Sequence, residues 1–200
     1  DGNGNVYLWG AMLEQGSYPT SYIPTNGTSA TRFEETANSS GDASTFNDSE
    51  GVLMAEISAL DNDGGNRRIS ISDDSASNRV VLGFAAGNSI LALVSSSGLQ
   101  FIITIATSDI KLNNKIALKY KENDFALWVN GIEVATDTSG NAPIGLSVLK
   151  MQGSNGVNDF YGNTKQIQYY DSALTDSELE KLTSWTSFSD MANGQLYTIE

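Results

Sequence analysis

The sequence predicts an all-β protein, a two-sheet antiparallel β-sandwich with one short helix near its C-terminal end. Apolar residues recur at every second position in runs of about five to eight residues, which is the period of a half-buried strand. Clusters of Gly, Asn, Asp and Ser separate these runs at regular intervals, as in sandwiches rather than in alternating strands and helices. A chain of 200 residues can bury a full core without disulfides, and it contains no cysteine.

The elements follow one another from the N-terminus as short strands joined by tight turns. The predicted strands are Val6–Leu13, Gly51–Ala59, Arg68–Ser72, Arg79–Phe84, Ile90–Ser95, Gln100–Ala106, Asn114–Tyr120, Phe125–Asn130, Ile132–Thr136, Ser147–Gln152 and Lys165–Tyr170. Asn130 and Gly131 predict a type I′ hairpin turn, because both central positions of that turn require positive φ. One helix is predicted after Leu174, where Thr175 and Glu178 have the spacing of a capping box. We expect it to pack on the edge of the sandwich.

The two ends of the chain differ from its middle. Residues 1–32 predict one strand followed by a Gly/Ser/Thr/Pro-rich linker, and 33–184 form the sandwich domain. Because one strand cannot form a domain, we expect it to close a domain upstream or to pair with the sandwich edge. Residues 185–200 are rich in apolar side chains and should pack on the domain or against another subunit. The chain begins at Asp1 without a leader, so we expect a fragment or a processed product.

Composition excludes several function classes. The 24 acidic and 11 basic residues give a net charge of −13, which disfavours nucleic acid as a partner. Histidine and cysteine are both absent, which excludes a Ser-His-Asp triad, thiol chemistry and the common zinc sites. No apolar run is long enough to span a bilayer, so no membrane partner is expected.

Two blocks resemble a known family. Residues 114–120 and 124–135 resemble the central hairpin of concanavalin A-like, laminin-G-like jelly rolls. Residues 160–162 and 167–178 resemble the last strand of that family and the start of its helix. The resemblance implies a jelly-roll sandwich and a lectin-like role.

A second resemblance concerns the ends of the chain. Trp9–Glu14 with Ser21–Thr25 and Thr31-Arg32 resembles the closing strand and exit linker of carbohydrate-binding jelly rolls in phage tail and bacterial surface proteins. Ser187–Ala192 resembles the C-terminus of phage structural proteins. This likeness implies the C-terminal module of a longer virion or secreted protein, and hence an extracellular or virion location.

The chain also departs from the catalytic and calcium-binding members of that fold. Their paired-carboxylate strand signature, Glu-x-Asp-x-x-Glu, is absent, and Glu50 and Glu56 stand alone. Where many relatives place an Asp-Glu pair that helps to hold calcium, this chain has Lys165-Gln166. We therefore predict no catalytic residue and no metal ligand. The acidic loops 61–66 and 73–74 leave calcium as an open alternative to plain solvated turns.

Five residues are predicted to bind sugar. In the strand Phe125–Asn130 side chains alternate, so Trp128 is expected on the outer, concave face, where its indole could stack on a sugar ring. The alternative is that Trp128 packs under a loop or the terminal helix. Asn130, Arg67, Tyr161 and Asp159 lie at predicted loops or strand ends, where binding residues concentrate. The same holds for three neighbouring loop or strand-end residues, Arg68, Asn155 and Asn158, and the alternative for all of them is ordinary turn formation.

The sequence therefore predicts a non-catalytic carbohydrate-binding module that recognises a polysaccharide or a cell-surface glycan, with multivalency across copies supplying avidity. Two alternatives remain at this stage. One is a structural or oligomerisation module of a tail fibre, with the C-terminal tail between subunits. The other is a polysaccharide-cleaving enzyme that uses Asp and Glu side chains.

Overall fold

The computed structural model describes residues 7, 9–15, 21–31 and 40–195. The chain divides into two units, 1–35 and 36–200. In the first unit the strand predicted at Val6–Leu13 is not seen, since residues 7 and 9–15 belong to no strand and the rest of the range lies outside the described residues. Among its described residues Tyr7, Trp9 and Leu13 are exposed, Trp9 by 86%, and no described strand pairs with them. The expectation that the segment Val6–Leu13 closes a domain upstream remains a prediction.

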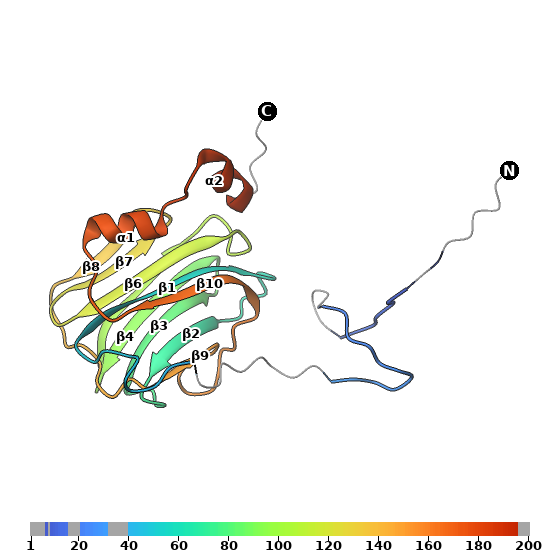
Figure 1. Cartoon of the computed structure of the whole chain (residues 1–200), viewed down its shortest axis with the longest axis horizontal. Coiled ribbons are helices and arrows are strands. Elements are labelled where there is room, and N and C mark those ends of the chain that lie inside the picture. The colour runs from blue at the N-terminus through green and yellow to red at the C-terminus, as the bar shows by residue number, and fades with distance from the viewer. Residues whose placement is uncertain (1–6, 8, 16–20, 32–39, 196–200) are drawn as a thin grey trace. The chain divides into compact units, whose positions relative to one another are not determined.

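The second unit is a sandwich of two five-stranded antiparallel sheets, as the sequence predicts (Figure 1). Sheet A has the order β10 (Gly162–Tyr170), β1 (Glu50–Ala59), β6 (Asn114–Lys121), β7 (Phe125–Val129) and β8 (Ile132–Asp137). Sheet B has the order β5 (Leu99–Ala106), β4 (Ser89–Ser96), β3 (Asn78–Ala85), β2 (Arg67–Ser72) and β9 (Val148–Lys150). Each strand coincides with a predicted run. At the β7–β8 turn Asn130 has φ 51° and Gly131 φ 85°, which confirms the type I′ hairpin.

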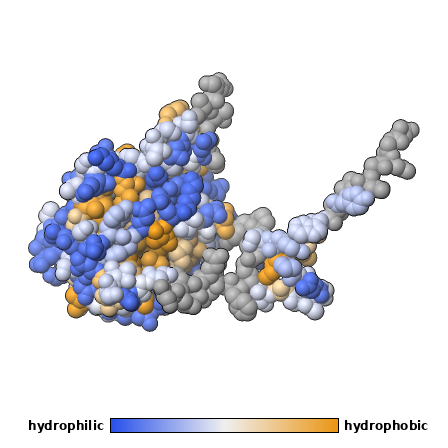
Figure 2. Space-filling model, viewed as in Figure 1, coloured by the Kyte–Doolittle hydropathy of each residue, from blue (hydrophilic) through white to orange (hydrophobic). Residues whose placement is uncertain are grey.

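The core lies between the two sheets. Alternate residues of each strand point inward, for example Leu53 and Leu118 from sheet A and Ile71 and Leu82 from sheet B, and all four are fully buried. The opposite set of alternate residues faces outward. The visible surface of the domain is largely hydrophilic, with apolar patches near its centre (Figure 2). The same alternation that fills the core therefore fixes which side chains are offered on the two outer faces.

Helix α1 (Asp176–Thr183) begins at the predicted capping box. The Thr175 N–H donates to Glu178 Oε2 at 2.8 Å. The helix lies on the outer side of β6, β7 and β8 (Figure 1). Leu179 is fully buried there in a second apolar cluster, with Leu174 and Leu182 packed at its margin. The sequence predicts a helix at the edge of the sandwich. The structure instead places it across the outer face of sheet A.

The C-terminal segment folds back on the domain as far as it is described. Gln195 at the end of α2 (Phe188–Gln195) donates from Nε2 to the Asn113 carbonyl at 2.6 Å. The Asn113 N–H donates to the Gly194 carbonyl at 3.2 Å, and Gly194 packs against the Trp185 ring. Among the described residues no helix has the length and apolar character needed to cross a membrane.

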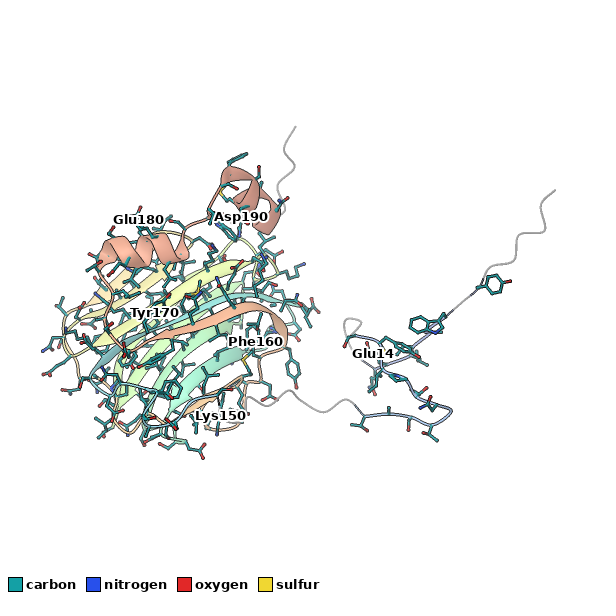
Figure 3. The ribbon with its side chains drawn as sticks, in the orientation of Figure 1. Glu14, Lys150, Phe160, Tyr170, Glu180 and Asp190 are labelled. Carbon is teal, nitrogen blue, oxygen red and sulfur yellow. The ribbon has the colours of Figure 1, made fainter. Side chains whose placement is uncertain are left out.

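Leu179→Ala should destabilise the domain by about 2–5 kcal/mol, because it leaves a cavity between α1 and sheet A. Urea unfolding followed by tryptophan fluorescence measures this. Glu180→Ala is the matched control on the exposed side of the same helix (Figure 3) and should change the free energy of unfolding by less than about 0.5 kcal/mol. Equal effects of the two changes would show that α1 is not docked through Leu179.

Candidate functional site

Trp128 does not form an exposed stacking platform, so that prediction is wrong. Its side chain does point to the outer face of sheet A, but it is only 7% exposed. Leu179 of α1 and Met54 of β1 belong to the same apolar cluster, and the helix covers the indole. The alternative, packing against the terminal helix, is the observed one. The indole Nε1 is buried without a hydrogen-bond partner among the described residues.

Asn130 and Arg67 are also engaged within the protein. Asn130 Oδ1 accepts the Lys115 N–H at 2.9 Å, and its Nδ2 donates to Asn114 Oδ1 at 3.1 Å, so the side chain fixes the hairpin. Arg67 is 2% exposed, which corrects its placement as an accessible binding residue. Its Nη2 donates to Asp63 Oδ1 at 2.8 Å, which closes the β1–β2 loop.

The remaining predicted residues belong to the loop 151–161, which joins β9 to β10. Lys150 and Phe160 mark its two ends in Figure 3. The loop is tied to sheet B, because Ser70 Oγ donates to the Gln152 carbonyl at 2.7 Å and the Arg68 N–H to the Asn158 carbonyl at 3.0 Å.

Tyr161 is 54% exposed at the end of this loop, and its hydroxyl donates to Asp159 Oδ2 at 3.3 Å. The loop therefore brings Tyr161, Asp159, Asn155 and Asn158 to the side of the sandwich where Arg68 lies. None of them meets Trp128 or Asn130, which belong to sheet A. The five residues predicted from the sequence do not form one site.

The outer face of sheet B presents the best-built candidate site. Its side chains follow three rows across the strands, fixed by the pairing register. The rows are Ser72–Arg79–Ser95–Leu99, Ser70–Val81–Leu93–Ile102 and Arg68–Gly83–Leu91–Thr104. None of the described helices packs on sheet B, whereas α1 covers much of sheet A. Hydroxyl groups, two guanidinium groups and apolar side chains therefore share one face on which no described helix packs. Ser70, Ser72 and Ser95 are buried on this face, whereas Leu99 and Ile102 are exposed.

Arg68 and Arg79 are the unusual members of this face. Both side chains are half-buried, and the Nε atom of each is buried with no hydrogen-bond partner among the described residues. Burial lowers the pKa of both guanidinium groups, and the charge of Arg79 lowers the pKa of Arg68 further. The guanidinium group of arginine is not deprotonated in proteins, so both side chains keep their positive charge. No described carboxylate forms an ion pair with either.

A hollow of about 490 Å³ lies beside Arg79. It is lined by side chains of β3, β4 and β5 and by their turns, among them Arg79, Leu93, Ser95, Ser97, Leu99 and Ile102. Ile102 is 51% exposed and Leu99 58%, so apolar surface is offered to solvent next to hydroxyl groups. Such a mixture suits a ligand that has both an apolar face and hydroxyl groups, as a sugar ring has.

Sequence reasoning missed Arg79 and Ile102, and it took Arg68 as one loop residue among several. Each lies within a predicted strand whose other face is apolar. Gly83 within β3 was an available signal, because glycine inside a strand often marks a close approach of another chain segment. A Cβ there would stand 2.0 Å from the Arg67 carbonyl oxygen, so only glycine fits beside Arg68.

The acidic loops are occupied by donors from the protein itself. Asp63 accepts from Arg67, and Asp73 Oδ2 accepts from Asn78 Nδ2 at 2.8 Å. Asp74 is paired with Lys150. Within the described residues no three acidic side chains gather as metal ligands would. The loops have the contacts of closed turns.

Glu56 is the buried carboxylate on the uncovered part of sheet A. Its two oxygens are held by Lys165 Nζ at 3.0 Å and by Gln166 Nε2 at 3.1 Å. Gln168 Nε2 continues the chain to Gln166 Oε1 at 2.8 Å, and Tyr170 OH donates to Gln168 Oε1 at 2.5 Å. These contacts make a polar ladder between β1 and β10, with one carboxylate at its end.

Comparison with known proteins shows that other solved structures share this fold. No protein-family model and no curated protein matches the chain. Solved structures do match it. The carbohydrate-binding module CBM40 of the Ruminococcus gnavus IT-sialidase, bound to α2,3-sialyllactose, superposes with a TM-score of 0.60 at 16% identity, over 72% of this chain and 92% of that one.

Two further structures share the fold. The leech intramolecular trans-sialidase, complexed with 2,7-anhydro-Neu5Ac, has a TM-score of 0.59 at 18% identity, and the match covers 71% of this chain and 24% of that one. The heptameric SAP-like pentraxin of Limulus polyphemus has a TM-score of 0.53 at 11% identity, over 70% and 71% of the two chains. These likenesses confirm the two-sheet jelly-roll sandwich fold.

Asp63→Asn should destabilise the protein at pH 7 by about 1–3 kcal/mol, because it leaves the buried Arg67 without its counter-charge. The N–H of Gly65, and then Arg67, hold the pKa of Asp63 below its ordinary value. A carboxyl group with a lowered folded-state pKa stabilises the fold above its unfolded-state pKa and loses that contribution as pH falls through the folded value. The difference between wild type and variant should therefore shrink below about pH 4.

Urea unfolding at pH 7 and at pH 3 measures the free energy of unfolding of the wild type and of Asp63→Asn. Asp61→Asn, in the same loop and outside any ion pair among the described residues, is the control and should show a small effect at both pH values. A difference between wild type and Asp63→Asn that is unchanged at pH 3 would contradict the electrostatic origin.

Proposed function

We propose that this protein is a non-catalytic carbohydrate-binding module that recognises a polysaccharide or a cell-surface glycan through the outer face of sheet B. One observation carries the proposal: the hollow beside Arg79, where serine hydroxyl groups, the Arg79 guanidinium group and exposed aliphatic side chains meet on a sheet that no described helix covers. This proposal replaces Trp128, Asn130 and Arg67 with Arg79, Arg68 and Ile102. Tyr161 and Asp159, on the adjoining loop, stay as proposed contacts at the margin.

The chemistry of the face matches that of a sugar. Serine hydroxyls and guanidinium N–H groups can form paired hydrogen bonds with vicinal hydroxyl groups, and Ile102 and Leu99 offer an apolar surface to the C–H face of a ring. An open hollow gives few contacts per sugar unit. We therefore expect weak single-site binding that becomes effective when several copies are presented together.

The solved neighbours support a glycan ligand. Structures of the R. gnavus module are named as bound to α2,3- and to α2,6-sialyllactose. At identities of 15–16% they share the fold with this chain, and the choice of ligand rests on the residues of this face. The absence of a histidine and the engagement of Glu56 by Lys165 and Gln166 support a binding rather than a cleaving role.

We further propose an extracellular or virion setting, in which the module is the C-terminal part of a longer phage tail or secreted protein. The support is the sequence likeness of 9–14, 21–25, 31–32 and 187–192 to such proteins. Exposed aromatic side chains at the ends, with Tyr7 91% and Phe188 66% exposed, suit contacts with an upstream domain or a neighbouring copy. Sedimentation or light scattering of the full chain tests the oligomer directly.

Ile102→Ser should weaken glycan retention by about 5–30-fold, since it removes roughly 1–2 kcal/mol of apolar contact from the hollow. Affinity electrophoresis in gels containing polysaccharides, after a glycan-array screen, measures this. Ile132→Ser is the matched control, because Ile132 is 65% exposed on the edge strand of the other sheet. It should bind as the wild type does.

Three outcomes would overturn the proposal. Retention lost equally in both variants would move the site away from sheet B. No retention by any glycan, together with a defined multimer, would favour the structural module. Release of reducing ends from a bound polysaccharide would favour the enzyme.

A further inference from the structure

We infer that the outer face of sheet B selects glycans that carry carboxylate groups, and that Arg68 and Arg79 receive the carboxylate. The inference rests on the proposed function and specifies its ligand class. It goes beyond sugar binding as such, because neutral glycans satisfy the hydroxyl and apolar parts of the same face equally well.

The two guanidinium groups converge from neighbouring strands. Arg68 pairs in register with Gly83, and Arg79 pairs with Ser72, so their side chains leave the same face of sheet B two rows apart. Both reach the same point of the loop 151–161. Arg79 Nη1 donates to Ser154 Oγ at 3.3 Å, and Arg68 Cδ lies 3.7 Å from the position that a Cβ on Gly153 would take.

Arg68 and Arg79 are half-buried and form no ion pair with a described carboxylate. Lys181 forms none either, but its side chain is exposed on α1. The protein has 24 acidic residues, and six other cations form ion pairs with them. These cations are Arg67, Lys111, Lys119, Lys121, Lys150 and Lys165. Lys115 instead lies over the Trp185 ring, 5.0 Å from its centre. Two half-buried like charges without a described counter-charge, in an acidic protein, are an arrangement that a bound anion would complete.

The shape of the site favours a carboxylate on a sugar. The planar fork of a guanidinium group matches a carboxylate through two parallel N–H···O bonds. Nucleic acid is disfavoured by the net charge of −13, and the hydroxyl and aliphatic side chains around Arg79 suit a pyranose ring. Sialic acids and uronic acids both offer such a carboxylate, and the experiment separates them.

A binding role for Arg68 and Arg79 also has a consequence for the stability of the free protein. Two desolvated cations that repel each other destabilise the free protein, so removing one charge while keeping the aliphatic stem should raise its stability. An arginine that served the fold would behave in the opposite way. Arg68→Met and Arg79→Met should each raise the melting temperature of the full chain by about 2–4 °C, and Lys181→Met should leave it unchanged.

The binding test uses matched charged and neutral ligands with the full-length chain. Sialyllactose is compared with lactose, and polygalacturonate with its methyl-esterified form, by calorimetry and affinity electrophoresis at two salt concentrations. The wild type should prefer at least one acidic member over its neutral partner by about 10-fold or more, and this preference should fall with salt. Arg68→Met and Arg79→Met should remove the preference, whereas Lys181→Met, which changes an exposed cation on α1, should retain it.

The outcomes distinguish failure of carboxylate recognition from failure of glycan binding. Equal binding of acidic and neutral members by the wild type, with Ile102→Ser still weakened, overturns the carboxylate inference and leaves the proposed function standing. Preference for sulfated dextran over both acidic glycans overturns the carboxylate as the recognised group. Arginine variants that melt at lower temperature and retain the acidic preference show the pair to be structural. Binding of no glycan at all overturns the proposed function.

Discussion

The burial of one face of each strand between the two sheets is the constraint on which the rest depends. Because side chains alternate along a strand, filling the core with Leu53, Ile71 and Leu82 commits their neighbours to the outside. A one-residue slip of β2 against β3 would turn Arg68 inward and expose Ile69 and Ile71. The position of the two arginines is therefore as strongly specified as the core itself.

Helix α1 decides which of the two outer faces is open. Its leucines meet Trp128 and close the β6–β8 part of sheet A, so the large aromatic group that the alternation places outside becomes part of a second core. The remaining part of that sheet is occupied by the ladder from Glu56 to Tyr170. No described helix packs on sheet B, and the exposed Leu99 and Ile102 lie there beside the half-buried Arg79.

The sequence sufficed for the fold because strand period, turn residues and the capping box are local signals. The site was harder, because its members meet only through pairing between strands. Trp128 was assigned to the correct side of its strand, but nothing local shows that Leu179, far along the chain, covers it. Arg79 begins an ordinary alternating run, and only the register beside β2 brings it near Arg68. The strand predicted at Val6–Leu13 has the right pattern but no described partner to pair with.

The electrostatics of the chain give the arginine pair its significance. Acidic groups are in excess in a protein with a net charge of −13, so a cation readily finds a carboxylate partner, as Lys119 does with Asp124. A long-range negative field would also repel an acidic glycan, so a site for one needs local positive charge that the protein's own acids do not consume. Arg68 and Arg79 meet that requirement because half-burial among Ser and aliphatic side chains keeps described carboxylates away while leaving the hollow beside Arg79 open. In the proposed site the acidity of the whole surface and the unpaired cations of one face would act together, so that an anionic sugar binds only beside the two guanidinium groups.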